Sequence, residues 1–305
     1  MNQPPAYAET ERHVVSGGLR LAVFESGSGP TLVFVHGYPD SHVAWDSVRA
    51  ELAQRFPHFH TVRYDVRGAG ASDAPRNLAG YRLGQLADDL FAVADAVSPN
   101  RPVHVVAHDW GSIQAWHAVT DPRAEQRFAS FTTISGPCLD HTAFWFRERF
   151  RHPTPRRLTQ LLRQGAKSWY IYAFHIPLAP RLLWRHWLAS RWSELLRKAE
   201  GIEPTPGHPQ PTLREDAIRG IGLYRANMIS RLRRPEFRFA KVPVQIISPL
   251  RDRFVSPALA EGLEHWAPDL RRETVACGHW GALTRRAPEV AEMIASFVEE
   301  IERVG

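Results

Sequence analysis

The segment Val105–Gln114, VVAHDWGSIQ, decides the fold of this chain. It joins the end of an apolar run, typical of a strand buried on both faces, to the beginning of a helical pattern. Ala107 and Gly111 place small residues two positions before and two positions after Asp109. A sharp strand-to-helix turn flanked in this way is a nucleophile elbow, which holds its apex side chain above the edge of a parallel sheet. The segment therefore predicts an α/β fold with Asp109 at its active edge.

A carboxylate at the apex changes the chemistry that the elbow supports. An aspartate has a reference pKa of about 3.9 and is ionised at neutral pH, whereas serine, the usual apex residue, must be activated by a base. A carboxylate that attacks a saturated carbon forms an alkyl ester, which water can cleave at the carbonyl, whereas a serine would form an ether. Asp109 therefore predicts substrates that lose a leaving group from saturated carbon, such as epoxides and alkyl halides.

The second half of such a reaction needs a base that activates water. His279 follows the last expected strand, in VACGHWGAL, and Asp252 follows the strand before it, in SPLRDRFVSP. The chain order is then nucleophile, acid, histidine, the order that accompanies this kind of elbow. We expect His279 to activate the water, and Asp252 to orient the imidazole and stabilise its charged form.

Two backbone N–H groups are expected to stabilise the oxyanion that forms when the ester is hydrolysed. One belongs to Trp110, directly after the apex, and the other to Tyr38, in the loop His36–Asp40 (HGYPD) that follows another apolar strand. Pro39 in this loop has no N–H and stiffens the turn. We also expect the substrate to contact Trp110 and His36.

Strands and helices alternate along most of the chain. Strand patterns are expected at residues 19–26, 31–37, 59–68, 102–111, 128–136, 242–248 and 272–278, and helical patterns at 83–97 and 288–304. This alternation implies an open, mostly parallel sheet with helices on both faces.

Residues 137–236 break the alternation. The segment lacks strand patterns, and helices are expected at 156–166, 168–175, 180–198 and 211–231, with a Pro-rich loop at 200–212. We predict a helical cap inserted between two parts of an α/β core, residues 1–136 and 237–305. Such a cap would cover the carboxyl ends of the strands, where open α/β sheets bind their ligands.

The charge of the chain does not indicate nucleic-acid binding. Of the 305 residues, 44% are hydrophobic and 23% charged, which is typical of a globular protein with a sizeable core. The net charge is +6, but the arginines are spread along the chain without a nucleic-acid-binding motif. The densest basic run, residues 147–167, is suited either to an acidic membrane surface or to a solvated helix face, and the solvated face is the favoured interpretation.

The sequence gives no indication of a cofactor or metal. Cys138 and Cys277 show neither metal-site nor disulfide spacing, which favours a reducing compartment. His104 and His108 have no third ligand nearby, and the Gly-rich loop after residues 59–68 lacks the P-loop lysine. Without a signal peptide or an apolar run that could span a bilayer, we expect a cytoplasmic protein. Whether it forms a homodimer stays open.

Five motifs together resemble the α/β-hydrolase-fold epoxide hydrolases, and the resemblance covers nearly the whole chain. These motifs are HGYPD (36–40), DVRGAGASD (65–73), HDWGS (108–112), RDRF (251–254) and GHWG (278–281). The resemblance implies a hydrolase that adds water to a small or medium apolar epoxide and releases a vicinal diol. Haloalkane dehalogenases share the HDWG motif, so this motif does not separate the two families.

The resemblance also implies two cap tyrosines that donate hydrogen bonds to the epoxide oxygen. WYIYAFHIP matches the context of the first, with histidine in place of the family's glutamine, and indicates Tyr170, with Tyr172 as a rival. GLYRANM matches the second context and indicates Tyr224. A tyrosine, with a reference pKa of about 10, is neutral at pH 7 and can protonate the alkoxide as the ring opens.

A haloalkane dehalogenase is the main alternative. A halide leaving group needs N–H donors: Trp110 would be one, and the second is typically an asparagine at the position of Tyr38 or a cap tryptophan. Tyr38 counts against this alternative, but the cap does hold five tryptophans, Trp145, Trp169, Trp184, Trp187 and Trp192. A non-catalytic ligand-binding protein is disfavoured by the complete set of Asp109, His279 and Asp252. A serine esterase is excluded by the apex residue.

Overall fold

An eight-stranded sheet forms the centre of the computed structural model, which describes residues 9–203, 205 and 207–304. The N-terminal segment 1–8, where no signal peptide is expected, and Pro204 and Pro206 of the Pro-rich loop lie outside the described residues. The strands follow the order β1-β2-β4-β3-β5-β6-β7-β8 across the sheet. Their bounds are Thr10–Ser16 (β1), Leu19–Ser26 (β2), Thr31–Val35 (β3), His60–Tyr64 (β4), Val103–His108 (β5), Phe128–Ile134 (β6), Val244–Pro249 (β7) and Leu270–Val275 (β8).

The sheet is parallel except at one edge, as predicted. β2 pairs antiparallel with both β1 and β4, and all other neighbours pair in parallel. The carboxyl ends of β3, β5, β6, β7 and β8 therefore meet at one edge of the sheet. The segments that directly follow β3, β5, β7 and β8 hold all the predicted site residues except the two cap tyrosines.

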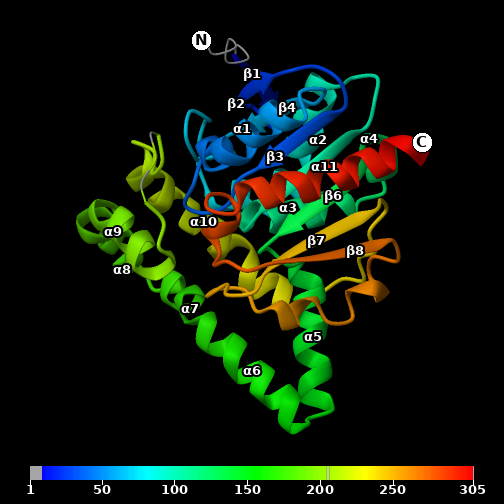
Figure 1. Ribbon diagram of the computed structural model, residues 1–305. Coiled ribbons are helices and arrows are strands. Elements are labelled where there is room, and N and C mark those ends of the chain that lie inside the picture. Colours follow the sequence, from blue (N-terminus) through cyan, green and yellow to red (C-terminus); the bar gives the residue numbers. More distant parts are fainter. Residues whose placement is uncertain (1–8, 204, 206, 305) are drawn as a thin grey trace.

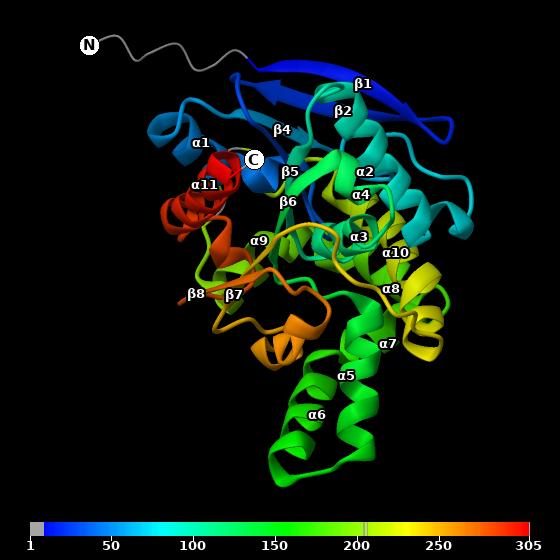
Figure 2. The same cartoon turned by 90° about the vertical axis from the view of Figure 1, so that its right-hand side faces the viewer.

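Helices cover both faces of the sheet (Figures 1 and 2). Along β3, Leu32 and Phe34 belong to the apolar cluster that contains residues of α1 and α11, whereas Val33 and Val35 belong to the cluster on the other face, with α2 and α3. This alternation follows from the pleat, and burial on both faces explains the continuous apolar run. The covering helices are α1 (Asp46–Arg55), α2 (Leu83–Val97), α3 (Trp110–Val119), α4 (Ala124–Arg127) and α11 (Ala287–Val304).

The segment between β6 and β7 is helical. It contains α5 (Leu139–Arg151), α6 (Pro155–Lys167), α7 (Trp169–His175), α8 (Ala179–Leu183), the π-helical turn Trp184–Leu188, α9 (Ala189–Glu200) and α10 (Leu213–Arg233). Tyr38 and Trp110 at the sheet edge share one apolar cluster with Leu213 and Tyr224 of α10. In both views α5 and α6 form a hairpin that projects away from the sheet, and α7 continues from α6 back toward it.

The sequence analysis missed β1, α1 and α5 for identifiable reasons, and it also missed the four-residue helix α4. β1 is an edge strand whose first four residues are exposed, so it lacks the alternation of a half-buried strand. α1 buries only Val48 and Leu52, and α5 is rich in aromatic and arginine residues, which weakens the helical pattern. The helix expected at 180–198 is divided into α8, the π-helical turn and α9. Short 3₁₀ turns complete the described chain at His42–Trp45, Leu78–Tyr81, Pro257–Ala260, Leu263–His265 and Trp280–Ala282.

Candidate active site

Asp109 occupies the apex of a strained turn between β5 and α3. Its backbone has φ 52° and ψ −122°, a region that non-glycine residues rarely adopt, and its N–H donates to the carbonyl of Ile134 in β6 at 3.0 Å. A Cβ atom at Gly111 would lie 2.2 Å from the carbonyl oxygen of Val35. Only a glycine therefore allows helix α3 to approach β3 this closely.

The two oxygens of the Asp109 carboxylate have different surroundings. Oδ1 accepts a hydrogen bond from the Tyr38 N–H at 2.8 Å, as expected for an oxyanion-hole donor. Oδ2 lies 3.5 Å from Nε2 of His279. The N–H of Trp110, the second expected donor, makes no hydrogen bond to Asp109 in the part of the chain that the structure describes. Oδ1 is thus held by a backbone N–H, and Oδ2 faces the imidazole of His279.

His279 and Asp252 form a buried hydrogen-bonded pair behind the nucleophile. Nδ1 of His279 lies 2.9 Å from Oδ2 of Asp252, and both side chains are only 1% exposed. Oδ1 of Asp252 accepts hydrogen bonds from the N–H groups of Phe254 at 2.7 Å and Val255 at 2.9 Å. These contacts fix the carboxylate, which in turn fixes the imidazole with Nε2 toward Asp109.

The charges of the pair are strongly coupled. Burial by itself would raise the pKa of Asp252, but the imidazolium of His279 and the two N–H groups lower it to about 2. Burial would lower the pKa of His279, but the Asp252 and Asp109 carboxylates outweigh it and hold this pKa well above its usual value. The resting site therefore stabilises a charged imidazole. An ester at Asp109 would carry no charge, so its formation would lower the pKa of His279 and favour the neutral base.

The two predicted cap tyrosines face the nucleophile from opposite helices. Tyr224 of α10 is only 3% exposed, and its ring centroid lies 4.8 Å from that of Trp110 and 5.9 Å from that of Tyr170 in α7. Burial, with the nearby Asp109 charge, raises the pKa of both tyrosines, so both hydroxyls stay protonated. Tyr172, the rival, is 73% exposed. The geometry therefore supports Tyr170 as the first cap tyrosine.

A largely apolar pocket of about 160 Å³ joins these groups. Asp109, Trp110, Tyr170 and Tyr224 all line it. Most of the remaining wall is hydrophobic and comes from α3, α5, α7, α10 and the loop after β7: Ile113, Leu139, Phe146, Ile171, Met228, Ile229, Leu232, Phe254, Val255 and Leu259. The pocket is suited to a small or medium apolar molecule that reaches Asp109.

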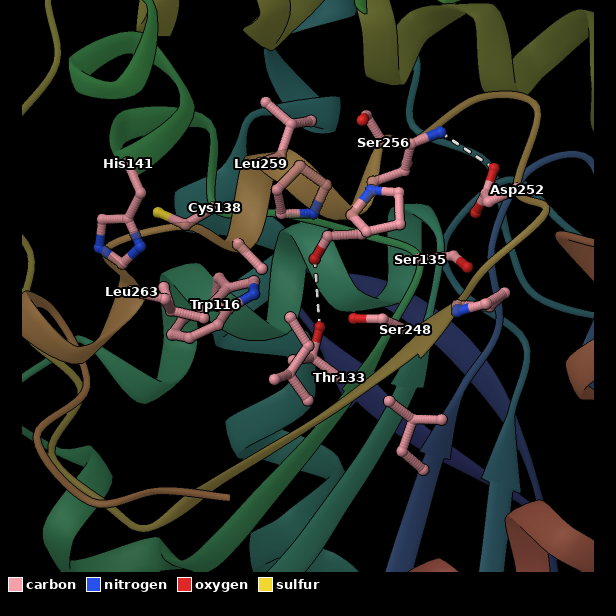
Figure 3. A pocket seen from close by; sticks show the side chains of 18 residues that line it. Trp116, Thr133, Ser135, Cys138, His141, Ser248, Asp252, Ser256, Leu259 and Leu263 are labelled. Atoms are coloured by element: carbon pink, nitrogen blue, oxygen red, sulfur yellow. Dashed lines mark hydrogen bonds between the residues drawn. The ribbon is translucent and has the colours of Figure 1, made fainter. Parts of the chain in front are cut away.

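Figure 3 shows a smaller neighbouring pocket of about 40 Å³, bounded by Asp252. It shares Ser135 and Leu259 with the first pocket, and Trp116, Cys138 and His141 close its far side. Burial raises the pKa of the Cys138 thiol to about 12, so this cysteine is not a ready nucleophile. Asp252 is the only carboxylate among the residues that line this cavity, and it is already hydrogen-bonded to His279.

Glu200, at the end of α9, is a site residue that the sequence analysis missed. Its carboxylate accepts hydrogen bonds from the N–H groups of His279 and Trp280, each at 2.8 Å, and of Gly281 at 3.2 Å. A Cβ at Gly278 would lie 2.8 Å from its carboxyl carbon. The cap thereby holds the backbone of the histidine loop. No local signal connects residues 79 positions apart in the sequence.

Asp40, the last residue of the HGYPD motif, supports the same loop from the core. It accepts a hydrogen bond from the indole N–H of Trp280 at 2.7 Å and lies 3.0 Å from Nε2 of His208 in the Pro-rich loop. The charge of His208 and these hydrogen bonds outweigh burial and lower the pKa of Asp40. Asp40 thus connects the loop after β3, the cap and the histidine loop.

His36 does not have the expected place at the substrate. It is fully buried, its Nε2 accepts a hydrogen bond from the Val66 N–H at 3.0 Å, and it is not among the residues that line the pocket. Its role is to hold two loops of the sheet edge together. Trp110, the other expected contact, does line the pocket. Among the described residues, no group of three or more His, Cys, Asp or Glu side chains is arranged to hold a metal ion.

Comparison with known proteins relates the chain to one family and to several curated relatives, including two proteins of Mycobacterium tuberculosis. The family model of the alpha/beta hydrolase fold matches residues 30–285. "Probable oxidoreductase EphD" of Mycobacterium tuberculosis is 38% identical over 289 residues, which cover 92% of this chain and 48% of that protein. "Epoxide hydrolase A" of the same organism is 31% identical over 172 residues, which cover 56% of this chain and 49% of that protein. The chain spans about half the length of these curated relatives.

Several solved structures with a similar fold are epoxide hydrolases. A variant of the Bacillus megaterium epoxide hydrolase, crystallised with its diol product, matches with a TM-score of 0.74 and 22% identity. The match covers 94% of this chain and 100% of that chain. The whole arrangement of sheet and helical insertion is thus shared with a known structure.

Proposed function

Since this chain belongs to the alpha/beta hydrolase fold family, we propose that it is an epoxide hydrolase that uses Asp109 as a covalent nucleophile. Oδ2 of Asp109 attacks a ring carbon of the epoxide, the carbon–oxygen bond breaks, and an alkyl ester forms. Tyr170 and Tyr224 donate hydrogen bonds to the leaving oxygen, and one of them transfers its proton as the alkoxide develops.

The second step releases the diol. Neutral His279 takes a proton from a water molecule, which attacks the carbonyl carbon of the ester. The N–H of Tyr38, which lies 2.8 Å from Oδ1 in the resting site, stabilises the oxyanion. The bond between this carbon and the ester oxygen, which is Oδ2 of Asp109, then breaks, and His279 returns its proton to that oxygen, so one Asp109 oxygen leaves with the diol. The carboxyl proton that the attacking water leaves on Asp109 restores the tyrosine. Asp252 stabilises the imidazolium throughout.

The residues that line the pocket favour an epoxide over an alkyl halide as the substrate. The residues that line the pocket include both cap tyrosines, which are acids for an alkoxide, and none of the five cap tryptophans. Trp184 is buried against Tyr38 and Trp192 instead, and the indole N–H of Trp145 donates to the carbonyl of Ala258. The wall opposite Asp109 is thus suited to protonating an oxygen, and Trp110 would have to hold a halide alone.

The proposed function is tested by offering matched substrates to the purified protein. Aryl and alkyl epoxides should give diols, whereas alkyl halides of the same carbon skeleton should release no halide. Diol is measured by chromatography and halide by ion analysis. Halide release without diol formation would replace this proposal with a dehalogenase.

The cap tyrosines should affect ester formation and not ester hydrolysis. Tyr170→Phe and Tyr224→Phe should each slow the alkylation of Asp109 by about 10²-fold, because one donor to the developing alkoxide is lost. The exposed Tyr172→Phe is the matched control and should change little. Single-turnover measurements separate the two steps. A damaging Tyr172→Phe beside a silent Tyr170→Phe would reverse the assignment of the first tyrosine.

A further inference from the structure

The cap carries a strong positive charge that the rest of the chain does not share. Residues 137–236 contain eighteen Lys and Arg against eight Asp and Glu, a formal charge of +10, so the remaining residues carry −4 of the total +6. Between residues 141 and 193, ten Lys and Arg accompany a single acidic residue, Glu148. Arg163, Arg181 and Arg185 there are exposed and make no ion pair within the described residues.

The same segment exposes large apolar side chains along two consecutive helices and at the end of the second. Leu158, Leu162, Trp169, Tyr172 and Ile176 are 47–75% exposed, and we call them the α6–α7 stripe. Leu158 and Leu162 are four residues apart in α6, and Trp169 and Tyr172 are three residues apart in α7, so each pair lies on one face of its helix, and Ile176 directly follows α7. The opposite face of α6 is turned inward.

The inner face of α6 is packed against the rest of the protein. Leu161 and Gln164 of α6 are buried, and the Gln164 side chain donates to the carbonyl of Phe254 at 3.0 Å and accepts from the N–H of Ser256 at 2.9 Å. α6 is therefore held against the core by its inner face. Its apolar outer face remains toward solvent.

The α6–α7 stripe is continuous with the mouth of the active-site pocket. Tyr172 belongs to the stripe and also lines the pocket, and Gly165 of α6 lines it as well. Across the mouth, Ile229 of α10 lines the pocket and is itself 48% exposed. Figure 1 shows α6 and α7 as one nearly straight run from the tip of the α5–α6 hairpin to the body of the molecule. An apolar phase in contact with the stripe would therefore lie beside the pocket mouth, and a molecule that leaves this phase could enter the pocket directly.

The combination of residues indicates which partner this surface fits. Trp and Tyr are enriched at membrane interfaces, and exposed arginines beside them attract anionic lipid headgroups. A second copy of the chain would bring two surfaces of the same positive sign together, which is unfavourable. Amphipathic helices of this kind lie in the plane of the interface with their apolar side in the acyl boundary. None of the described helices combines the length and the apolar character that crossing a bilayer requires.

We propose that the α6–α7 stripe seats the cap on an anionic phospholipid bilayer and that the pocket takes lipophilic epoxides from it. The substrate part of this inference rests on the proposed function, and the membrane part does not. The apolar side chains enter the interface, the arginines contact lipid phosphates, and the pocket mouth beside Tyr172 opens at the membrane surface.

Vesicle sedimentation tests the membrane contact. The full chain should sediment with vesicles of phosphatidylcholine and phosphatidylglycerol, less with phosphatidylcholine alone, and less again at high salt. Leu158→Ser with Leu162→Ser should weaken binding at least about tenfold, because two large side chains no longer enter the interface. Val15→Ser with Leu78→Ser removes side chains that are 67% and 47% exposed outside the cap, and this matched control should bind normally.

Two further readouts keep the outcomes distinct. Leu158 and Leu162 do not line the pocket, so their double variant should hydrolyse a short water-soluble epoxide at the normal rate. Normal hydrolysis with no vesicle binding by the unaltered chain would overturn the membrane proposal alone. Vesicle binding without turnover of any epoxide would overturn the proposed function alone. Light scattering could instead show that the unaltered chain is a dimer and that the double variant is a monomer, with no vesicle binding by the unaltered chain. This outcome would make the stripe a dimer interface.

Discussion

Asp109→Ala is expected to abolish diol formation, with a loss on the order of 10⁴-fold or more, because no other group can form the ester. The carboxylate lies at the sheet edge, with one oxygen held by the Tyr38 N–H and the other toward His279. Its removal takes away the atom that attacks the substrate but none of the apolar core. Purified Asp109→Ala protein should therefore show no burst and no covalent adduct when mixed with epoxide.

The fold of this variant is checked independently of activity. Its circular dichroism should match that of the unaltered chain, and it should still unfold in one cooperative transition. If the variant loses both its activity and this unfolding transition, the loss of activity reflects unfolding. Asp109→Asn, which keeps the size of the side chain, then serves as the second variant. More than a trace of diol from a folded Asp109→Ala protein would refute the covalent role.

His279→Gln is expected to form the ester and then to stop. Ionised Asp109 attacks without a base, so alkylation should proceed, whereas hydrolysis loses the group that activates water and should slow by about 10²- to 10⁴-fold. Mass spectrometry of the variant with substrate should show an adduct equal to the whole epoxide. After digestion, this adduct should lie on the peptide that contains Asp109.

The unaltered enzyme provides the complementary measurement. One turnover in heavy-oxygen water, with enzyme in excess, should place the label in the Asp109 carboxylate and leave the diol mostly unlabelled. Hydrolysis of the ester should also slow as the pH falls through the pKa of His279, because only the neutral imidazole accepts a proton from water. Alkylation should not follow that dependence. Labelled diol with unlabelled enzyme and no adduct would instead indicate direct attack of water.

Local patterns in the sequence predicted the fold class and the order of the catalytic candidates. The elbow around Asp109 depends on the residues next to it, since a strand, a sharp turn and small flanking residues are all adjacent in the chain. His279 and Asp252 were found because each directly follows a strand, and parallel strands bring their carboxyl ends to one edge. The α/β fold with its mostly parallel sheet is confirmed by the structure and by the family match.

Packing between distant segments decided what the sequence left open. The spacing of Tyr170 and Tyr172 allows either side chain to face Asp109, and only the docking of α7 against α10 packs the partly buried Tyr170 beside Tyr224 and exposes Tyr172. The five cap tryptophans could not be placed for the same reason. Which face of a cap helix meets the pocket depends on its neighbours in space, and periodicity identifies the faces but not their partners.

The sequence by itself determined that this chain places Asp109, Asp252 and His279 at the carboxyl edge of a parallel sheet, because strand ends and turns are local features. Only the tertiary structure decided that Glu200, 79 residues before His279, holds the histidine loop, and that Asp40 joins this loop to the cap. The tertiary structure also decided that the basic run around α6 exposes an apolar stripe beside the pocket mouth. Such contacts follow from the burial of each helix against elements that the chain reaches only after folding.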